Sequence, residues 1–163
     1  MFDFTGQVVA ITGASSGIGL EIARKFYLAG ARLALCSRSE ERVRSAVADW
    51  ADTGDTRLLI ISADTSIIED IYRFRDAAVE KFGRIDVWVN NAGIERPMPT
   101  VDMTQEIFDA VVHTNFRGYY FGCQSAAQDM LRRGKGGAII NIGSVNAVTV
   151  VPGQAVYAAT KAA

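Results

Sequence analysis

Tyr157 and Lys161 are the pair of residues in this sequence best suited to acid–base chemistry. They are four positions apart, so on a helix they share one face, with Cβ atoms about 6 Å apart. A tyrosine hydroxyl is a weak acid, but an ammonium on the next turn favours its phenolate form. The pair can therefore serve as a general acid and base. A solvated helix face that carries a Tyr and a Lys is the alternative for the pair alone.

Two further polar residues occupy positions where chemistry is plausible. Ser144 follows a strand expected at 138–142, at the carboxyl edge where open α/β sheets bind ligands. Asn115 interrupts the apolar face of a long helix expected over 104–133, although asparagine is a poor helix former. Taken alone, Ser144 could instead be an ordinary turn residue, and Asn115 could be a partly exposed residue of the helix.

A glycine-rich segment, Thr12–Gly19, has the composition of a phosphate-binding turn. It lies between an expected strand and an expected helix, so backbone N–H groups and the positive end of a helix dipole converge there. Gly13 can form the tight turn, Gly17 lets the backbone approach a pyrophosphate, and Gly19 allows close packing of helix and strand. The spacing is neither G-x-G-x-x-G nor a P-loop. A strand-to-helix turn without a ligand is the alternative.

The elements that must position these residues alternate between apolar runs of strand length and longer amphipathic stretches. That alternation predicts a parallel α/β sheet, and the nearly all-apolar strands suit a sheet buried on both faces. The expected strands are at 8–12, 33–36, 58–61, 85–89 and 138–142. The predicted fold class is α/β, with a doubly wound parallel sheet of Rossmann type in a single domain over residues 1–163.

Local signals mark the ends of several helices. Gly30 and Gly83 are expected as left-handed helix stops. Ser39 is expected to cap a helix, and Ser66 with Glu69 has the pattern of a capping box. The long helix over 104–133 has one apolar face, formed by Ile107, Phe108, Val111, Val112, Phe116 and Tyr119.

Composition excludes several classes of function. The formal net charge of the 163 residues is −1, so no global field favours nucleic acid or an anionic membrane. No apolar run is long enough to span a bilayer, and the N-terminus lacks the plan of a signal peptide. Cys36 and Cys123 have no metal-ligand spacing and are expected to be buried small hydrophobes. We therefore expect a cytoplasmic protein without a metal site.

Three motifs make the chain resemble the short-chain dehydrogenase/reductase family. Thr12–Gly19 is similar to its T-G-x-x-x-G-x-G cofactor motif, Asn90–Gly93 to its N-N-A-G motif, and Tyr157–Lys161 to its Y-x-x-x-K motif. The resemblance spans nearly the whole chain. It implies hydride transfer between a nicotinamide dinucleotide and a small carbonyl or alcohol substrate.

The resemblance also implies a role for each member of a catalytic tetrad, formed by Asn115, Ser144, Tyr157 and Lys161. Tyr157 would protonate the carbonyl oxygen and remove that proton in the reverse direction, while Ser144 would hydrogen-bond the same oxygen. Lys161 would bind the nicotinamide ribose hydroxyls and assist ionisation of the tyrosine. Asn115 would kink its helix and hold a water in a proton relay to Lys161.

Most of the cofactor contacts implied by the resemblance follow the ends of four strands, and Tyr157 and Lys161 add to them. Asp64 and Thr65 match positions that contact adenine, and the segment after the fourth strand matches positions that line the adenosine ribose. The full implied set is Gly13, Ser15, Ser16, Gly17, Ile18, Gly19, Ser37, Arg38, Asp64, Thr65, Asn91, Ala92, Gly93, Tyr157 and Lys161.

The pair Ser37–Arg38, which closes the second strand, points to NADP(H). An acidic residue there would accept from the ribose 2′-hydroxyl of NAD(H), whereas an arginine pairs with a 2′-phosphate. Ser15 or Ser37 could add a hydrogen bond. Ser16 stands where many NADP-preferring relatives carry a second basic residue, so NAD(H) stays the alternative cofactor.

Family members have about 250 residues, whereas this sequence ends at Ala163. We therefore expect the family's last strands and its substrate-covering segment to be missing, the helix with Tyr157 and Lys161 to fray, and strand 138–142 to be an open apolar edge. The alternatives to an active reductase are a non-catalytic dinucleotide-binding module and an inactive fragment of a longer short-chain reductase. A methyltransferase-like Rossmann protein would have no use for the Tyr–Lys pair. Full-length relatives usually form homo-oligomers.

The substrate pocket is expected to include residues 94–96 and 145–150, which mix apolar and polar side chains. That mixture suits acyl thioesters, sugars, steroids and small ketones alike.

Overall fold

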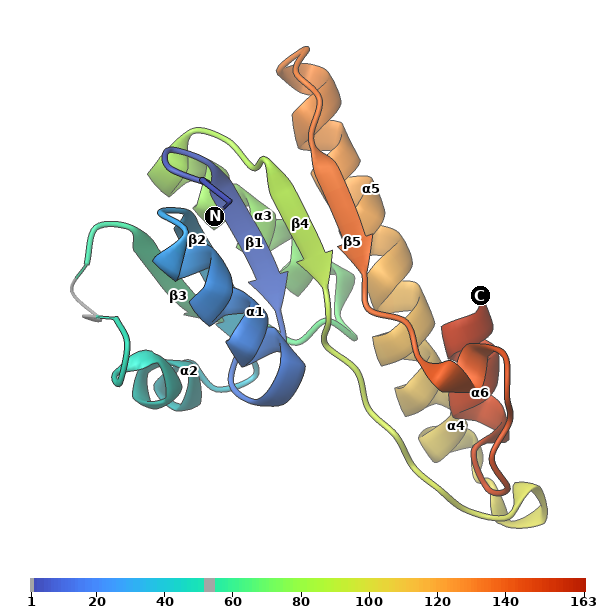
Figure 1. Cartoon of the computed structure of the whole chain (residues 1–163). Helices are drawn as coiled ribbons and strands as arrows, with labels where there is room; N and C mark the ends of the chain where they lie inside the picture. The colour runs from blue at the N-terminus through green and yellow to red at the C-terminus, as the bar shows by residue number, and fades with distance from the viewer. Residues whose placement is uncertain (1, 52–54) are drawn as a thin grey trace.

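Five parallel strands form one sheet in the order β3-β2-β1-β4-β5 (Figure 1). The structure is a computed structural model that describes residues 2–51 and 55–163. The strands are β1 (Val8–Thr12), β2 (Arg32–Ser37), β3 (Leu58–Ser62), β4 (Val87–Asn90) and β5 (Ala138–Asn141). Their bounds differ from the predicted ones by at most two residues. The chain order reverses between β1 and β4, which confirms the predicted doubly wound sheet.

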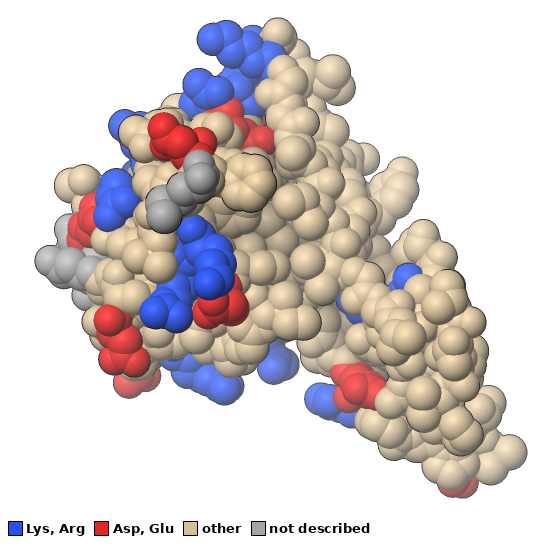
Figure 2. Space-filling view, viewed as in Figure 1, with Lys and Arg blue, Asp and Glu red and all other residues tan. Residues whose placement is uncertain are grey.

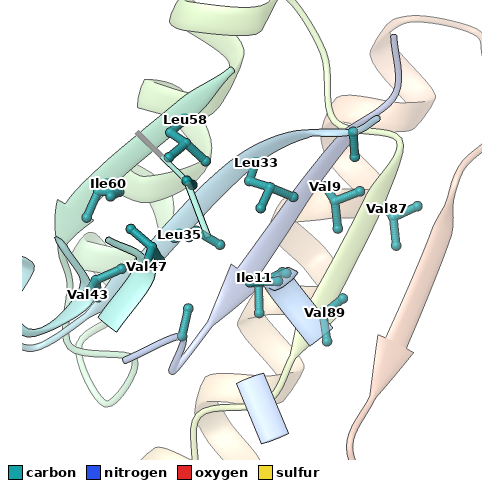
Figure 3. Close-up of a cluster of buried hydrophobic side chains, with 14 residues drawn as sticks. Val9, Ile11, Leu33, Leu35, Val43, Val47, Leu58, Ile60, Val87 and Val89 are labelled. Carbon is teal, nitrogen blue, oxygen red and sulfur yellow. The ribbon is translucent and has the colours of Figure 1, made fainter. Parts of the chain in front are cut away.

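Helices cover both faces of the sheet because successive strand residues point to opposite sides. On one face, α1 and α2 pack on side chains such as Ile11 and Leu35 (Figure 3). On the other face, α3 and α5 pack on the remaining strand residues, and the rings of Phe74 and Trp88 have centroids 5.4 Å apart. The helices are α1 (Gly17–Leu28), α2 (Glu40–Val47), α3 (Ile68–Phe82), α4 (Gln105–Val112), α5 (Gly118–Arg132) and α6 (Ala155–Ala162).

The predicted helix stops are confirmed, but one predicted start is wrong. Gly30 (φ 90°) follows α1, and Gly83 (φ 79°) follows α3, both in the left-handed region. Ser39 caps α2 by accepting from the N–H of Arg42 at 3.2 Å. Ser66 forms no capping box with Glu69, because α3 starts at Ile68 without a side-chain cap. The Ser66 hydroxyl instead donates to the Asp64 carboxylate at 2.8 Å.

The single helix expected over 104–133 is divided in two by a π turn at His113–Arg117. A π turn adds one residue per turn, so the apolar face does not continue straight from α4 into α5. Val111 is buried as predicted, whereas Phe108 and Phe116 are each 45% exposed. Asn115 lies inside the π turn and is almost completely buried, which is the opposite of a partly exposed position.

The β5 side of the molecule differs from the rest of its surface. All four residues of β5 are exposed, and Ile139 and Ile140 are 36% and 40% exposed. Figure 2 shows few charged side chains on this side, whereas they are frequent on the side of α1 and α2. Beyond β5, a 3₁₀ turn at Val145–Ala147 leads into α6, which packs against α4. The predicted open apolar strand is therefore present at the edge of the sheet.

The two cysteines differ in burial. Cys36 is completely buried, and burial raises the pKa of its thiol to about 12. Cys123 is only partly buried, contrary to the prediction, and its sulfur lies 3.3 Å from the Asn90 amide nitrogen and 3.5 Å from Oδ1 of Asn141 in the exposed strand β5. Among the residues that the structure describes, no helix is both long and apolar enough for a membrane span.

Candidate active site

The loops that follow β1, β2, β3 and β4 meet around a cavity of about 870 Å³ at the carboxyl edge of the sheet. This is the edge, at a reversal of strand order, where open α/β sheets bind ligands. Small-molecule sites have volumes of roughly 300–1,000 Å³, so the cavity suits a large ligand. The predicted cofactor residues that line it are Gly13, Ser15, Ser16, Ser37, Arg38, Asp64, Thr65, Asn91, Ala92 and Gly93. Those outside its lining are Gly17, Ile18, Gly19, Tyr157 and Lys161.

Hydrogen bonds from Thr12 and Asn91 hold the glycine turn against the end of β4. The Thr12 hydroxyl oxygen accepts from the backbone N–H groups of Asn91 (3.0 Å) and Ala92 (3.1 Å). In return, the Asn91 side-chain amide donates to the carbonyl oxygens of Thr12 (3.0 Å) and Gly13 (3.1 Å). The two loops of the cavity floor are therefore one connected unit.

Close approach of these loops requires glycine at two positions. A Cβ on Gly13 would lie 2.8 Å from the Ala92 Cα, and the φ of Gly13 is +68°. A Cβ on Gly19 would collide with the Asn91 side-chain amide and with the carbonyl oxygen of Gly13. By contrast, nothing lies within 4 Å of a Cβ on Gly17 among the described residues. The turn therefore packs tightly against β4 at both ends and is open in its middle, where a ligand could approach.

The cavity carries an excess of positive charge. Arg38, Arg42 and Arg96 line it, and Asp64 is the acidic residue among its lining. The Asp64 carboxylate accepts from the backbone N–H (2.9 Å) and the hydroxyl (2.8 Å) of Ser66. A cavity with this balance suits an anionic ligand such as the phosphates of a dinucleotide.

Asp70 supports the loop after β3. Its carboxylate accepts from the backbone N–H of Asp64 at 2.8 Å and pairs with Arg73 at 2.7 Å. Burial acts to raise the pKa of Asp70, but these partners outweigh it and hold the pKa below its ordinary value. The carboxylate is therefore ionised when it fixes the position of Asp64.

Lys161 is held next to the cavity by two acceptors. Its Nζ donates to the carbonyl oxygen of Ile142 (2.8 Å) and to the hydroxyl of Tyr119 (3.0 Å). Partial burial lowers the pKa of Lys161. An ammonium has three donors, so one is left for a ligand. The Nζ lies 6.0 Å from the ring centre of Tyr157, on the preceding turn of α6.

Asn115 connects the π turn to the loop after β4 and to α6. Its Oδ1 accepts from the N–H of Ile94 (2.8 Å), and its Nδ2 donates to the carbonyl oxygen of Ile94 (2.8 Å) and to the Thr160 hydroxyl (3.3 Å). A Cβ on Gly93 would lie 3.3 Å from Asn115 Oδ1 and 3.8 Å from Lys161 Nζ. Gly93 is therefore the place where the cavity meets two of the predicted catalytic residues.

Ser144 and Tyr157 lie on either side of the turn that precedes α6. The Ser144 hydroxyl oxygen accepts from the N–H of Asn146 at 3.2 Å, which caps the 3₁₀ turn. Tyr157 is partly buried in α6. Within the described residues, no hydrogen bond joins Ser144 to Tyr157. The structure thus brings Asn115 and Lys161 to Gly93, and leaves the Ser144 and Tyr157 hydroxyls without a direct link.

Sequence reasoning missed several residues of the site. Tyr119 was assigned to an apolar face, yet its hydroxyl contacts Lys161, and burial and then the nearby Tyr157 raise its pKa. His113 also lines the cavity. Ile94 and Arg96, which were expected in the substrate pocket, line this cavity, whereas residues 145–150 do not. The other unpredicted lining residues are Ser39, Arg42, Ala63, Ser66, Ala110 and Thr114.

The signal that could have identified some of these residues is their place directly after a strand or in a first helical turn. Ser39, Arg42 and Ser66 all follow strand ends that meet at the carboxyl edge. Among the described residues, no group of three or more His, Cys, Asp or Glu side chains is arranged to hold a metal ion.

Comparisons with known proteins give a consistent result. A family model described as short chain dehydrogenase matches residues 7–163. L-rhamnose-1-dehydrogenase of Scheffersomyces stipitis is 38% identical over 160 residues, which cover 96% of this chain and 62% of that protein. 3beta-hydroxysteroid dehydrogenase 2 of Eggerthella lenta is 33% identical over 157 residues, covering 96% of this chain and 60% of that protein.

Solved structures agree with the sequence matches. A metagenomic short-chain oxidoreductase, solved in complex with NADP, superimposes with a TM-score of 0.86 at 34% identity, covering 97% of this chain and 71% of that one. The chain spans 43–62% of the length of the curated relatives it matches.

Proposed function

Because this chain belongs to the short-chain dehydrogenase family, we propose that it carries the cofactor-binding and catalytic part of an NADP(H)-dependent carbonyl/alcohol oxidoreductase. The observation that carries the proposal is the cavity at the carboxyl edge, where the glycine turn, Asn91 and Arg38 surround one space beside Lys161. Bound NADP(H) would supply or accept the hydride.

The residues present fit a dinucleotide. Gly13 and Gly19 permit the packing that leaves the middle of the turn open for a pyrophosphate, and α1 begins there at Gly17. Arg38 is exposed at the end of β2, and within residues 2–51 and 55–163 it forms no ion pair. Its guanidinium can pair bidentately with a 2′-phosphate. A similar chain solved with NADP adds support for this cofactor over NAD(H).

Tyr157 is the proposed general acid and base. Its hydroxyl donates a proton to the substrate oxygen during reduction and recovers it during oxidation, while the Ser144 hydroxyl hydrogen-bonds the same oxygen. Both hydroxyls lie on segments that follow β5, although neither residue lines the cavity itself. Among the described residues the Ser144 hydroxyl accepts from the Asn146 N–H and donates to no group, so its proton is available for the substrate.

Lys161 is the proposed source of the charge that assists Tyr157. Its two contacts with Ile142 and Tyr119 fix the ammonium and leave one N–H for a ribose hydroxyl. Its Nζ lies 6.0 Å from the centre of the Tyr157 ring. Asn115 positions Lys161 by tying the loop at Ile94 to α6 through Thr160.

Replacement of Tyr157 by phenylalanine tests the catalytic part. The loss of NADPH absorbance is followed with a panel of aldehydes and ketones, for the wild-type chain and for Tyr157→Phe. We expect the variant to lose turnover by at least about 100-fold while its affinity for NADPH is unchanged. Tyr120→Phe is the matched control, because Tyr120 is 59% exposed on α5.

Two results would count against this proposal. A fully active Tyr157→Phe would remove Tyr157 from the mechanism. A wild-type chain that binds NADPH but consumes none with any carbonyl substrate would be a binding module and not an oxidoreductase.

The remaining expectations belong to the whole protein. Its substrate is proposed to be a small-molecule carbonyl or alcohol, and the names of the relatives include a sugar and a steroid dehydrogenase. A homo-oligomer and a cytoplasmic location stay predictions, as does the absence of nucleic-acid and membrane partners.

A further inference from the structure

Arg42 and Ser39 reach the same cavity as Arg38, although neither was expected there. Both come from the segment after β2, where Ser39 caps α2 and Arg42 lies in its first turn. The Ser39 hydroxyl oxygen accepts from the Arg42 N–H at 3.2 Å. This contact holds the first turn of α2 next to Arg38, and it therefore sets the position of the Arg42 backbone.

The hydroxyl expected to assist Arg38 is already engaged. Ser37 Oγ donates to the carbonyl oxygen of Ser39 at 2.8 Å and accepts from the Ser39 N–H at 3.2 Å. A serine hydroxyl has one proton, so Ser37 has none left for a phosphate oxygen. Among the described residues, the Ser39 hydroxyl only accepts, so its proton is available to the cavity.

The charged residues of α2 differ in whether they reach the cavity. Arg44 binds Glu40 through two hydrogen bonds of 2.7 and 2.8 Å, and neither residue lines the cavity. Glu41 is exposed and also outside the lining. Within residues 2–51 and 55–163, Arg42 forms no ion pair. Arg42 is therefore the charge of α2 that faces the ligand cavity.

We propose that Arg42, with Ser39, completes the 2′-phosphate site begun by Arg38 and thereby sets the preference for NADP(H). This inference rests on the proposed function. Ser16, from the glycine turn, lines the same cavity but has no charge. Arg42 of α2 is thus the second positive charge at the 2′-phosphate, and the hydroxyl that donates to this phosphate is that of Ser39 in place of Ser37.

Binding of two adenosine nucleotides to the complete chain tests the proposal without any turnover. Calorimetric titrations use adenosine 2′,5′-bisphosphate and, as its partner without the 2′-phosphate, 5′-AMP. We expect Arg42→Ala to weaken the bisphosphate about tenfold, equal to about 1.4 kcal/mol, and to change 5′-AMP less than about twofold. Higher salt should weaken the bisphosphate less in Arg42→Ala than in the wild type, because one phosphate contact is gone.

Two variants separate this role from a change in the stability of α2. Arg44→Ala removes an arginine two positions away that does not line the cavity, and it should leave both affinities unchanged. Arg42→Lys keeps the charge and should retain most of the bisphosphate affinity, whereas Arg42→Gln keeps the stem and should bind like Arg42→Ala.

The outcomes distinguish this inference from the proposed function. If the wild type prefers the bisphosphate and Arg38→Ala loses that preference, but Arg42→Ala binds like the wild type, Arg42 has no role and NADP(H) stands. If the wild type binds both nucleotides equally or binds neither, the NADP(H) proposal fails and the role of Arg42 fails with it.

Discussion

Removal of the Asn115 side chain should loosen the connection between the cofactor cavity and α6. Asn115 is 1% exposed and makes three hydrogen bonds, two of 2.8 Å to the backbone of Ile94 and one of 3.3 Å to Thr160. Each of these hydrogen bonds contributes about 1 kcal/mol net to the free energy of unfolding, and the longest contributes least. Because Ile94 is half-buried, water can replace part of what is lost. Asn115→Ala should therefore lower the free energy of unfolding by about 2–3 kcal/mol.

Thermal unfolding followed by circular dichroism measures this cost. In a domain of this size, each 1 kcal/mol shifts Tm by roughly 2–4 °C, so we expect Tm to fall by roughly 5–10 °C. Gln105→Ala, at an exposed position of α4, is the control and should stay within about 0.5 kcal/mol of the wild type. A loss below about 0.5 kcal/mol in Asn115→Ala would show that the three bonds do not hold the loop at Ile94, and would refute the positioning of Lys161 through Asn115.

Three more perturbations follow from the same contacts. Gly19→Ala should weaken NADPH binding at least tenfold (about 1.4 kcal/mol) in a fluorescence titration, because its methyl group would displace the Asn91 amide; unchanged affinity would mean that this packing is irrelevant. Cys36 has a buried thiol with its pKa raised from 9.0 to about 12, so the unfolded chain releases its proton first and stability falls as pH rises. Between about pH 8 and about pH 10 the wild type should lose about 1.4 kcal/mol of unfolding free energy relative to Cys36→Ala in denaturant titrations, and parallel curves would contradict the burial of the thiol. Tyr119→Phe should remove one acceptor from Lys161 and destabilise the chain by about 1 kcal/mol in chemical denaturation, whereas a stabilised variant would show that the contact is unfavourable.

The sheet could be predicted from the sequence because its signals are local. Residues 8–12 and 58–62 are apolar runs whose length and alternation with helices admit few other structures. Gly30 and Gly83 mark helix ends through backbone conformations that glycine adopts most readily. Each of these predictions depends on neighbours within one turn or one strand.

Features that depend on contacts between residues far apart in the chain could not be predicted from the sequence. The π turn at His113–Arg117 holds Asn115 against Ile94, a residue 21 positions earlier in the chain. The capping box does not form because α3 starts at Ile68 with Ile67 at its N-cap position, and the Ser66 hydroxyl instead donates to the Asp64 carboxylate. Polarity alone also could not tell which arginines of residues 38–44 face the cavity, because Arg42 and Arg44 are both exposed.

The sequence predicted which loops surround the candidate site better than it predicted the contacts between their side chains. The motifs located the loops that surround the cavity, while the engagement of the Ser37 hydroxyl and the contact between Tyr119 and Lys161 required coordinates. Roles for the tetrad stay predictions until the variants are measured.

Titration of the 163-residue chain with NADPH, followed by cofactor fluorescence and compared with NADH, tests the central claim most directly. We predict saturable binding, with NADPH at least tenfold (about 1.4 kcal/mol) tighter than NADH. A chain that is folded by circular dichroism but binds neither cofactor would contradict the assignment of the cavity. Equal affinity for the two would contradict the 2′-phosphate site.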